Sequence, residues 1–157
     1  MSFDAASAIY AGLIGGAAMI VPLYMGIAMI PSQMKMNLLL LLGTMMIFKG
    51  GMMAYAAGAM IHAGMSIAIG LIHVAVYRAI GLESELAAWG LLFGLVQWIV
   101  VGLGLGMMRF MHPLIRSGEM DGPGPFALNF PAMTIVGFLM LHLLFGVLVG
   151  TLYEVFI

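Results

Sequence analysis

Long apolar runs alternate along the chain with short segments that hold most of the charged residues. Crossing about 30 Å of hydrocarbon takes roughly 20 helical residues at 1.5 Å each. Four runs meet this length, at residues 5–30, 51–77, 87–108 and 131–153. The pattern therefore predicts an all-α protein, an integral membrane bundle of four transmembrane helices.

A fifth apolar run, at residues 38–48, is too short to cross a membrane. Its 11 residues would span about half of the hydrocarbon core as a helix. Lys49-Gly50-Gly51 then interrupts the run. We expect a short interfacial or re-entrant half-helix that leads into the second span.

The composition supports the same conclusion. Of the 157 residues, 64% are hydrophobic and 7% are charged, whereas soluble domains carry about 25% charged residues. We expect one transmembrane domain over residues 1–157, with the lipid bilayer as its surroundings. A net charge of −1 argues against nucleic acid as a partner, because that requires clustered Lys and Arg. The absence of cysteine excludes disulfides and thiolate metal sites.

The distribution of basic residues predicts an orientation. Four spans place Lys35, Lys49, Arg109 and Arg116 on one side and Arg78 on the other. The positive-inside rule assigns the side with more Lys and Arg to the cytoplasm. We therefore expect the loops at 31–50 and 109–130 inside and both termini outside.

The two halves of the chain, residues 5–78 and 84–156, are similar to each other. AGLIGG from Ala11 aligns with WGLLFG from Trp89, and IHAGMSIAIGLIH aligns with LHLLFGVLVGTLY, at offsets of 78 and 80 residues. The second alignment places His62 on His142. Apolar, glycine-rich sequence also produces such matches by chance. A true duplication predicts two tandem helical hairpins related by a pseudo-twofold axis along the membrane normal.

Pairs of small residues four apart occur in every predicted span. Because lipid is as apolar as leucine, such pairs stabilise bundles by letting helix backbones approach closely. We expect them to pack the helices of this bundle together, and the alternative is that some bind another subunit. The pairs are Gly12 with Gly16, Ala54 with Gly58, Gly90 with Gly94, Gly102 with Gly106, and Gly146 with Gly150.

His62 and His142 are the candidate residues for chemistry, since both lie well inside predicted spans. Two imidazoles on facing helices can ligate haem iron or hold a metal ion. Two neutral imidazoles in hydrogen bonds with neighbouring helices explain the same sequence more simply. His73 lies about 16 Å along the helix from His62 on the same face. We expect His73 to be a wet residue at the membrane boundary, close to Arg78.

A second candidate site is formed by Met108, Met111 and His112, which are spaced for one helical face. Thioether and imidazole ligands suit Cu(I). Methionine is also a flexible filler of apolar packing, and packing is the simpler interpretation here. The following segment, residues 112–131, holds Gly122-Pro-Gly-Pro125, and we expect it to be a solvated loop.

The chain resembles a family of small bacterial four-span membrane proteins of unassigned function. The resemblance lies in NLLLLLGTMM, AAGAMIHAGMSIAIGL, GLLFGLVQWIVVGL and PAMTIVGFLMLHLLFGVLVGTLY. It implies an inner-membrane protein with a histidine in the second and fourth spans, at His62 and His142. Lys35 and Lys49 depart from family members whose first loop is acidic or neutral.

Three functions remain open at this stage. We favour a non-catalytic accessory or scaffold subunit that packs through its glycine faces against other membrane protein subunits and needs no cofactor, because the sequence predicts no substantial water-facing domain. Motifs of hydrolases and phosphate-binding loops are also missing. The first alternative is a redox protein that binds haem b or copper through His62 and His142. The second is a small transporter or channel that uses the same histidines.

Overall fold

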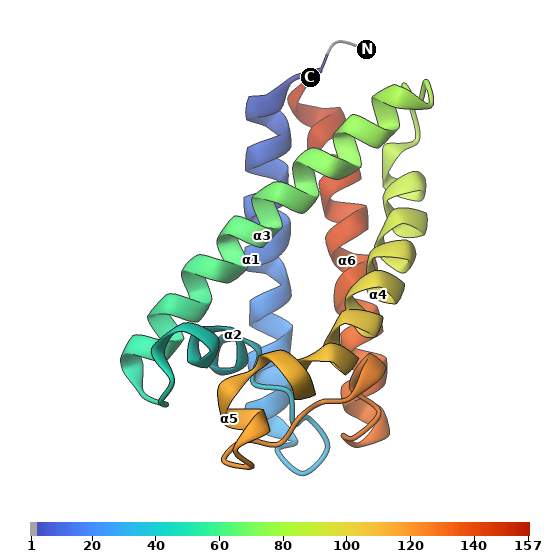
Figure 1. Ribbon diagram of the computed structural model, residues 1–157. Coiled ribbons are helices and arrows are strands. Elements are labelled where there is room, and N and C mark those ends of the chain that lie inside the picture. The colour runs from blue at the N-terminus through green and yellow to red at the C-terminus, as the bar shows by residue number, and fades with distance from the viewer. Residues whose placement is uncertain (1–2) are drawn as a thin grey trace.

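The computed structural model describes residues 3–157, and these residues are helical apart from the connecting segments (Figure 1). The elements are α1 (Ala5–Met29), α2 (Leu38–Ile47), α3 (Met52–Ala79), α4 (Leu86–Met111), α5 (Pro113–Arg116), the 3₁₀ turn η1 (Pro125–Ala127) and α6 (Ala132–Phe156). Helices α1, α3, α4 and α6 are long and apolar enough to cross a membrane. The four expected spans and the short half-helix are therefore confirmed, with ends that differ by at most three residues.

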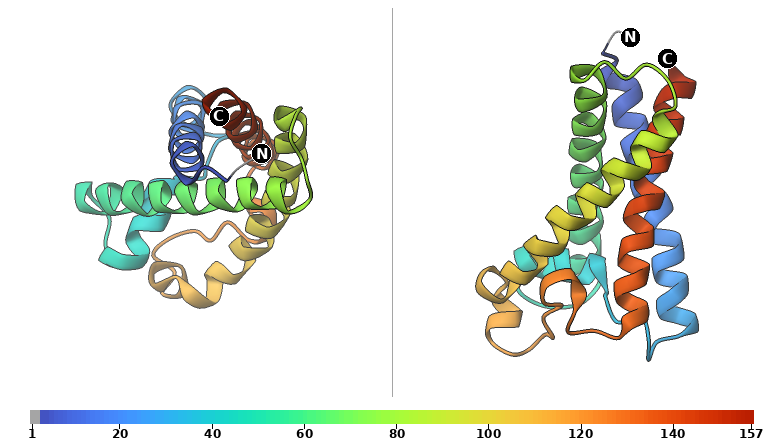
Figure 2. Two further views of the ribbon diagram at one scale, coloured as in Figure 1. Left: turned by 90° about the horizontal axis from the view of Figure 1, so that it is seen from above. Right: turned by 90° about the vertical axis from the view of Figure 1, so that its right-hand side faces the viewer.

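The long helices are arranged as two crossed pairs. Helices α1 and α6 lie side by side, α3 packs across α1, and α4 packs across α6 (Figure 2). In the part of the chain that the structure describes, α3 and α4 approach each other near the turn that joins them and then diverge (Figure 1). The short elements α2, α5 and η1 gather at the wide end between them.

Glycine brings the backbones of α1 and α3 together. A Cβ atom on Gly12 would lie 2.5 Å from the carbonyl oxygen of Ser66, and a Cβ atom on Gly70 would lie 2.9 Å from the carbonyl oxygen of Ala8. Real Cβ atoms do not approach other atoms this closely. Residues without a side chain are therefore required at this crossing.

The crossing of α4 and α6 repeats these contacts. A Cβ atom on Gly90 would collide with the carbonyl group of Gly146, and one on Gly150 would collide with that of Leu86. The offsets of 78 and 80 residues convert one set of contacts into the other, since Ala8 corresponds to Leu86 and Ser66 to Gly146. The aligned residues thus make corresponding contacts, as two similar hairpins require.

The twofold relation between the hairpins is incomplete. An axis that exchanges them would bring α3 and α4 as close together as α1 and α6. Instead α1 and α6 pack along their length, whereas α3 and α4 diverge. The divergence opens one side of the bundle, and the inserted elements α2, α5 and η1 occupy its wide end.

The remaining small-residue pairs contact the inserted elements. Gly58 abuts the backbone of Leu39 in α2, while Gly102 and Gly106 receive the side chains of Phe126 and Pro125 from η1. All nine glycines singled out in the sequence therefore pack against elements of this same chain.

The prediction of a solvated loop over residues 112–131 is wrong for its second half. Ala127 is fully buried, and the Phe126 ring packs 4.8 Å from the ring of Trp98. Phe126 and Ala127 adopt left-handed backbone angles, with φ of 52° and 62°. The turn therefore places the Phe126 ring against Gly102 of α4, where there is no side chain in its way.

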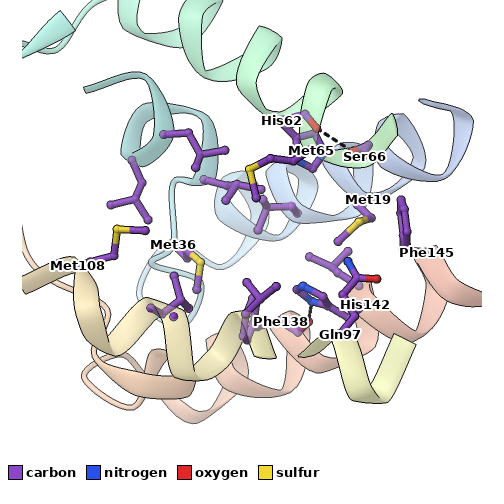
Figure 3. Close-up of a pocket in the computed structure, with 18 of the residues that line it drawn as sticks. Met19, Met36, His62, Met65, Ser66, Gln97, Met108, Phe138, His142 and Phe145 are labelled. Atoms are coloured by element: carbon purple, nitrogen blue, oxygen red, sulfur yellow. Dashed lines mark hydrogen bonds between the residues drawn. The ribbon is translucent and has the colours of Figure 1, made fainter. Parts of the chain in front are cut away.

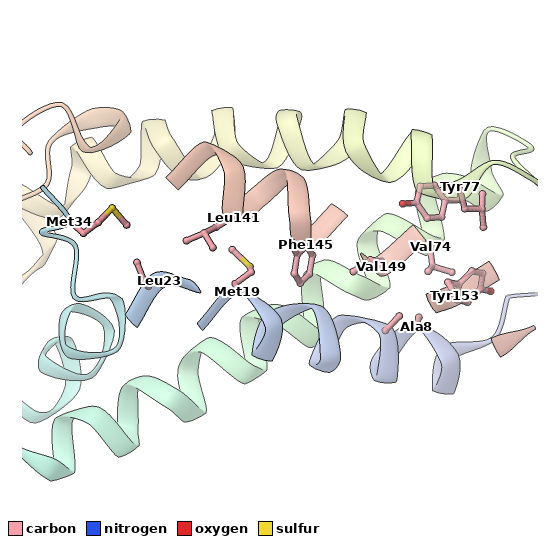
Figure 4. Packing of buried hydrophobic residues seen from close by; sticks show 12 residues of the cluster. Ala8, Met19, Leu23, Met34, Val74, Tyr77, Leu141, Phe145, Val149 and Tyr153 are labelled. Carbon is pink, nitrogen blue, oxygen red and sulfur yellow. The ribbon is translucent and has the colours of Figure 1, made fainter. Parts of the chain in front are cut away.

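The larger cluster of buried apolar side chains follows the contact between α1 and α6 and also includes residues of α3 and α4 (Figure 4). This cluster extends from Met34 at the wide end to Tyr153 at the narrow end. A second cluster at the wide end joins α2, α4, η1 and α6, through Leu41, Leu105 and Phe138 among others. Both clusters fix the frame within which α3 and α4 diverge.

A polar group of three residues ties α2 to the bundle. The hydroxyl of Tyr24 donates to Asn37 Oδ1 at 2.7 Å, and Asn37 Nδ2 donates to the hydroxyl of Tyr55 at 2.6 Å. Asn37 also caps α2, because its Oδ1 accepts the backbone N–H of Leu40. One side chain therefore joins α1, α2 and α3.

Candidate functional site

A cavity of about 380 Å³ lies between the diverging helices (Figure 3). Its walls come from α1, α2, α3, α4 and α6 and are mostly apolar. Seven methionines take part, namely Met19, Met34, Met36, Met65, Met107, Met108 and Met111. The polar side chains in the lining are His62, Ser66, Gln97, Thr134 and His142.

The cavity opens between α3 and α4. Met65 on α3 lines it and is 40% exposed, and Met107 and Met111 on α4 line it and are 55% and 59% exposed. Side chains that both line a cavity and reach the surface mark its mouth. The cavity is thus a lateral pocket in the side of the bundle.

His62 lies in the wall formed by α3 and is held by α1. Its Nε2 lies 3.0 Å from the carbonyl oxygen of Gly16. A carbonyl can only accept, so Nε2 carries the proton of this hydrogen bond. The lone pair of a neutral His62 is therefore on Nδ1. One turn further on, the hydroxyl of Ser66 donates to the backbone carbonyl of His62 at 2.8 Å.

His142 lies in the opposite wall, on α6 (Figure 3). Its Nδ1 lies 2.8 Å from the carbonyl oxygen of Phe138, one turn earlier in the helix. The Phe138 ring contacts the imidazole edge-on, with 4.5 Å between centroids. By the same argument Nδ1 donates and the lone pair of a neutral His142 is on Nε2.

The two histidines that the repeat alignment paired therefore share one cavity. Each donates one N–H to a backbone carbonyl, an arrangement that is also typical of metal-binding histidines. Within residues 3–157, no group of three or more His, Cys, Asp or Glu side chains is placed to hold a metal ion. Ligation of haem or copper by His62 and His142 stays a prediction.

Met108, Met111 and His112 have different surroundings from one another. The thioethers of Met108 and Met111 line the cavity. His112 is fully buried against α2, where its Nε2 lies 3.0 Å from the carbonyl oxygen of Leu41 and 3.1 Å from the hydroxyl of Thr44. Its Nδ1 accepts the backbone N–H of Ile115 at 3.4 Å. Nε2 thus holds α2 to the end of α4 and Nδ1 caps α5, so copper binding would require a ring nitrogen to be released.

The expectation that His73 is a wet residue at the membrane boundary is wrong. The side chain is 5% exposed and lies edge-on to Phe93 and Phe145, with 5.8 Å between centroids in each case. The helix continues to Ala79, and α4 and α6 cover this face near the narrow end. His73 is therefore part of the interior of the bundle.

Gln97 is a cavity residue that was not singled out in the sequence. Its Oε1 is buried, and the side chain lies beside the imidazole of His73. The signal was present, since Gln97 is a polar side chain in the middle of an apolar span. Polar groups at such a position face protein or a cavity rather than lipid.

Comparison of the chain with protein-family models, curated proteins and solved structures finds no match. The resemblance to small bacterial four-span membrane proteins therefore stays a prediction. The candidate function rests on the geometry of the cavity.

Proposed function

We propose that the protein binds a small lipid-soluble molecule in the cavity between α3 and α4. The observation that carries this proposal is a lateral pocket of about 380 Å³ with apolar walls and a few polar side chains. Pockets for small molecules measure roughly 300–1,000 Å³ and have this kind of lining. No catalytic group is needed for the role.

The position of the mouth suits a ligand that arrives from the membrane. In a bilayer, the side of the bundle between α3 and α4 faces hydrocarbon, so a lipid-soluble molecule can enter without crossing water. The methionines around the cavity are flexible and polarisable, and they adapt to ligands of different shape. His62 and His142 lie near the middle of their helices, where polar side chains are costly and often mark a binding site.

A pair of glycine variants tests the proposal. Gly104 lines the cavity and Gly64 lies on the exposed face of α3, and a Cβ atom on either would meet no described atom within 4 Å. Gly104→Leu should therefore project an isobutyl group into the cavity from a position where its Cβ meets no clash, and Gly64→Leu is the matched control. Solvent extracts of the purified proteins are compared by mass spectrometry.

We expect a small molecule to be extracted in near-stoichiometric amount from the wild-type and Gly64→Leu proteins and to be lost from Gly104→Leu. Equal amounts of every extracted species from all three proteins would contradict the proposal.

An accessory subunit of a larger membrane complex is a second candidate function. The observation that favours it is the exposed face of α3, where Gly64 and Ala68 form a small-residue pair outside the bundle contacts. Size-exclusion of the native protein in mild detergent tests it. Elution with a larger assembly that is lost in Gly64→Leu and kept in Gly104→Leu would support this role, and elution of a small species in every case would oppose it.

A haem or copper protein is favoured by the placement of His62 and His142 in one cavity. A Soret band or stoichiometric copper in the purified protein that disappears in His142→Phe would support it, and a colourless, metal-free protein would oppose it.

A transporter that uses this cavity predicts flux into liposomes that Gly104→Leu abolishes.

A further inference from the structure

The histidine and hydroxyl side chains of the cavity donate their hydrogen bonds to backbone carbonyls. His62 donates to Gly16, His142 donates to Phe138, and the hydroxyl of Ser66 donates to His62. A side chain whose proton is already used in this way can still accept a hydrogen bond. The cavity therefore presents acceptors.

The two imidazoles define this character most clearly. A charge at this depth in a membrane is costly, so each ring is taken as neutral, with one donor and one acceptor nitrogen. The donors are fixed as Nε2 of His62 and Nδ1 of His142 by their carbonyl partners. The acceptors are then Nδ1 of His62 and Nε2 of His142, and neither has a hydrogen bond in the described part of the chain.

Gln97 differs from these residues, because its side-chain amide holds donors as well as an acceptor, and its Oε1 is buried beneath the cavity surface. The hydroxyl oxygen of Ser66, which has donated its own proton, adds another acceptor to the same lining.

We propose that the cavity selects a lipid-soluble molecule whose polar end donates hydrogen bonds through a hydroxyl group, that is, an alcohol or a phenol. This inference rests on the proposed binding function. A hydroxyl supplies a hydrogen-bond donor to Nδ1 of His62 and Nε2 of His142. A ketone or an ether of the same shape brings another acceptor and leaves those atoms without a partner. One hydrogen bond in an apolar site corresponds to about a tenfold difference in affinity.

The experiment compares 4-propylphenol with 4-propylanisole, which differ in the replacement of the hydroxyl proton by a methyl group. Binding of each radiolabelled probe is measured on the wild-type protein in lipid nanodiscs, with empty nanodiscs as the blank. We expect the phenol to bind about tenfold more tightly than the anisole. His142→Phe removes Nε2 but keeps an aromatic ring, so it should lower this ratio while anisole binding is unchanged.

Two control variants separate this inference from the proposed function. Gly64→Leu should keep the wild-type ratio, and Gly104→Leu should bind neither probe. Equal affinities for the two probes that are both lost in Gly104→Leu would overturn the selectivity and leave the binding function standing. Absence of binding to the wild-type protein would overturn both. If His142→Phe does not fold, as judged by circular dichroism, His62→Phe provides the same comparison at the other wall.

Discussion

Gly12 and Gly70 lie backbone against backbone where α1 crosses α3, and 2.8 Å separates the Cα of Gly12 from the position of a Cβ on Gly70. Carbon atoms prefer about 3.5–4.0 Å, so no side chain fits between these helices. The corresponding crossing of α4 and α6 is as close. These two crossings hold the narrow end together, and the side chains at the wide end set α3 and α4 apart. The cavity is a consequence of this geometry.

The first prediction concerns the glycine contacts. In Gly146→Ala the added methyl group would collide with the carbonyl of Gly90, so α4 and α6 must separate. We expect a loss of about 1–3 kcal/mol in the free energy of unfolding, as is usual for overpacking. Unfolding by sodium dodecyl sulfate in mixed micelles measures it. In the control, Gly64→Ala, the added methyl group lies in open space. Its free energy of unfolding should be unchanged or rise by up to about 1 kcal/mol. Equal stability of both variants would refute the contact.

The second prediction concerns the attachment of α2. His112 donates from Nε2 toward Leu41 and Thr44, which joins α2 to the end of α4. His112→Leu should lower the free energy of unfolding by about 1–3 kcal/mol, since buried polar partners are lost. Thr44→Val should cost less, about 1 kcal/mol, because the bond to Leu41 remains. Faster tryptic cleavage at the exposed Lys49 should follow in the same order.

Ser117→Ala is the control for this prediction. Ser117 lies in the turn after α5, and its hydrogen bonds are exposed. Its cleavage rate and stability should match the wild type. If His112→Leu were cleaved no faster than this control, the histidine would not hold α2 in place.

The third prediction concerns pH. The hydroxyl of Ser7 donates to Asp4 Oδ2 at 2.7 Å, and this hydrogen bond lowers the pKa of the Asp4 carboxyl below its ordinary value. A group whose pKa is lowered by folding adds stability above its unfolded pKa of about 3.9, and this stability is lost as the pH falls through the folded pKa. Protonation should therefore loosen the first turn of α1, which Asp4 caps.

Hydrogen exchange of the first-turn amides of α1 provides the measurement. Protection in the wild type, relative to Asp4→Asn, should be greatest near neutral pH and should disappear on acidification below about pH 4. Asparagine still caps a helix but does not titrate in this range. The same loss of protection in Asp4→Asn would assign it to another group.

The sequence was sufficient to predict the long helices because their signal is local. Length and apolarity alone identify a segment that can cross a membrane, and Lys49-Gly50-Gly51 ends the short apolar run. The pairing of His62 with His142 also came from the sequence, through the offsets between the halves, and the structure places both in one cavity.

The cavity itself has no local signal. It depends on where the helices cross and on how far α3 and α4 then diverge, and several segments far apart in the sequence determine this together. His73 shows the same limit, since its position near Arg78 indicated water while the packing of α4 and α6 buries it. The left-handed backbone at Phe126 falls on a residue that rarely adopts it, and the contact of the ring with Gly102, on a distant helix, accounts for it.

The last prediction concerns the orientation of the protein when it is expressed in a bacterial inner membrane. The chain has no cysteine, so a single introduced cysteine reports its own side without background. Ser84 lies in the exposed turn between α3 and α4, and Ser117 lies in the exposed turn after α5 at the opposite end of the bundle. The end with Ser117 also holds Lys35, Lys49, Arg109 and Arg116, and an excess of basic residues favours the cytoplasm.

In spheroplasts, a membrane-impermeant maleimide should therefore label Ser84→Cys, and it should label Ser117→Cys only after the membrane is permeabilised. The reverse pattern would invert the orientation and place both termini inside, and it would also move α2 and the wide end of the cavity to the outer leaflet.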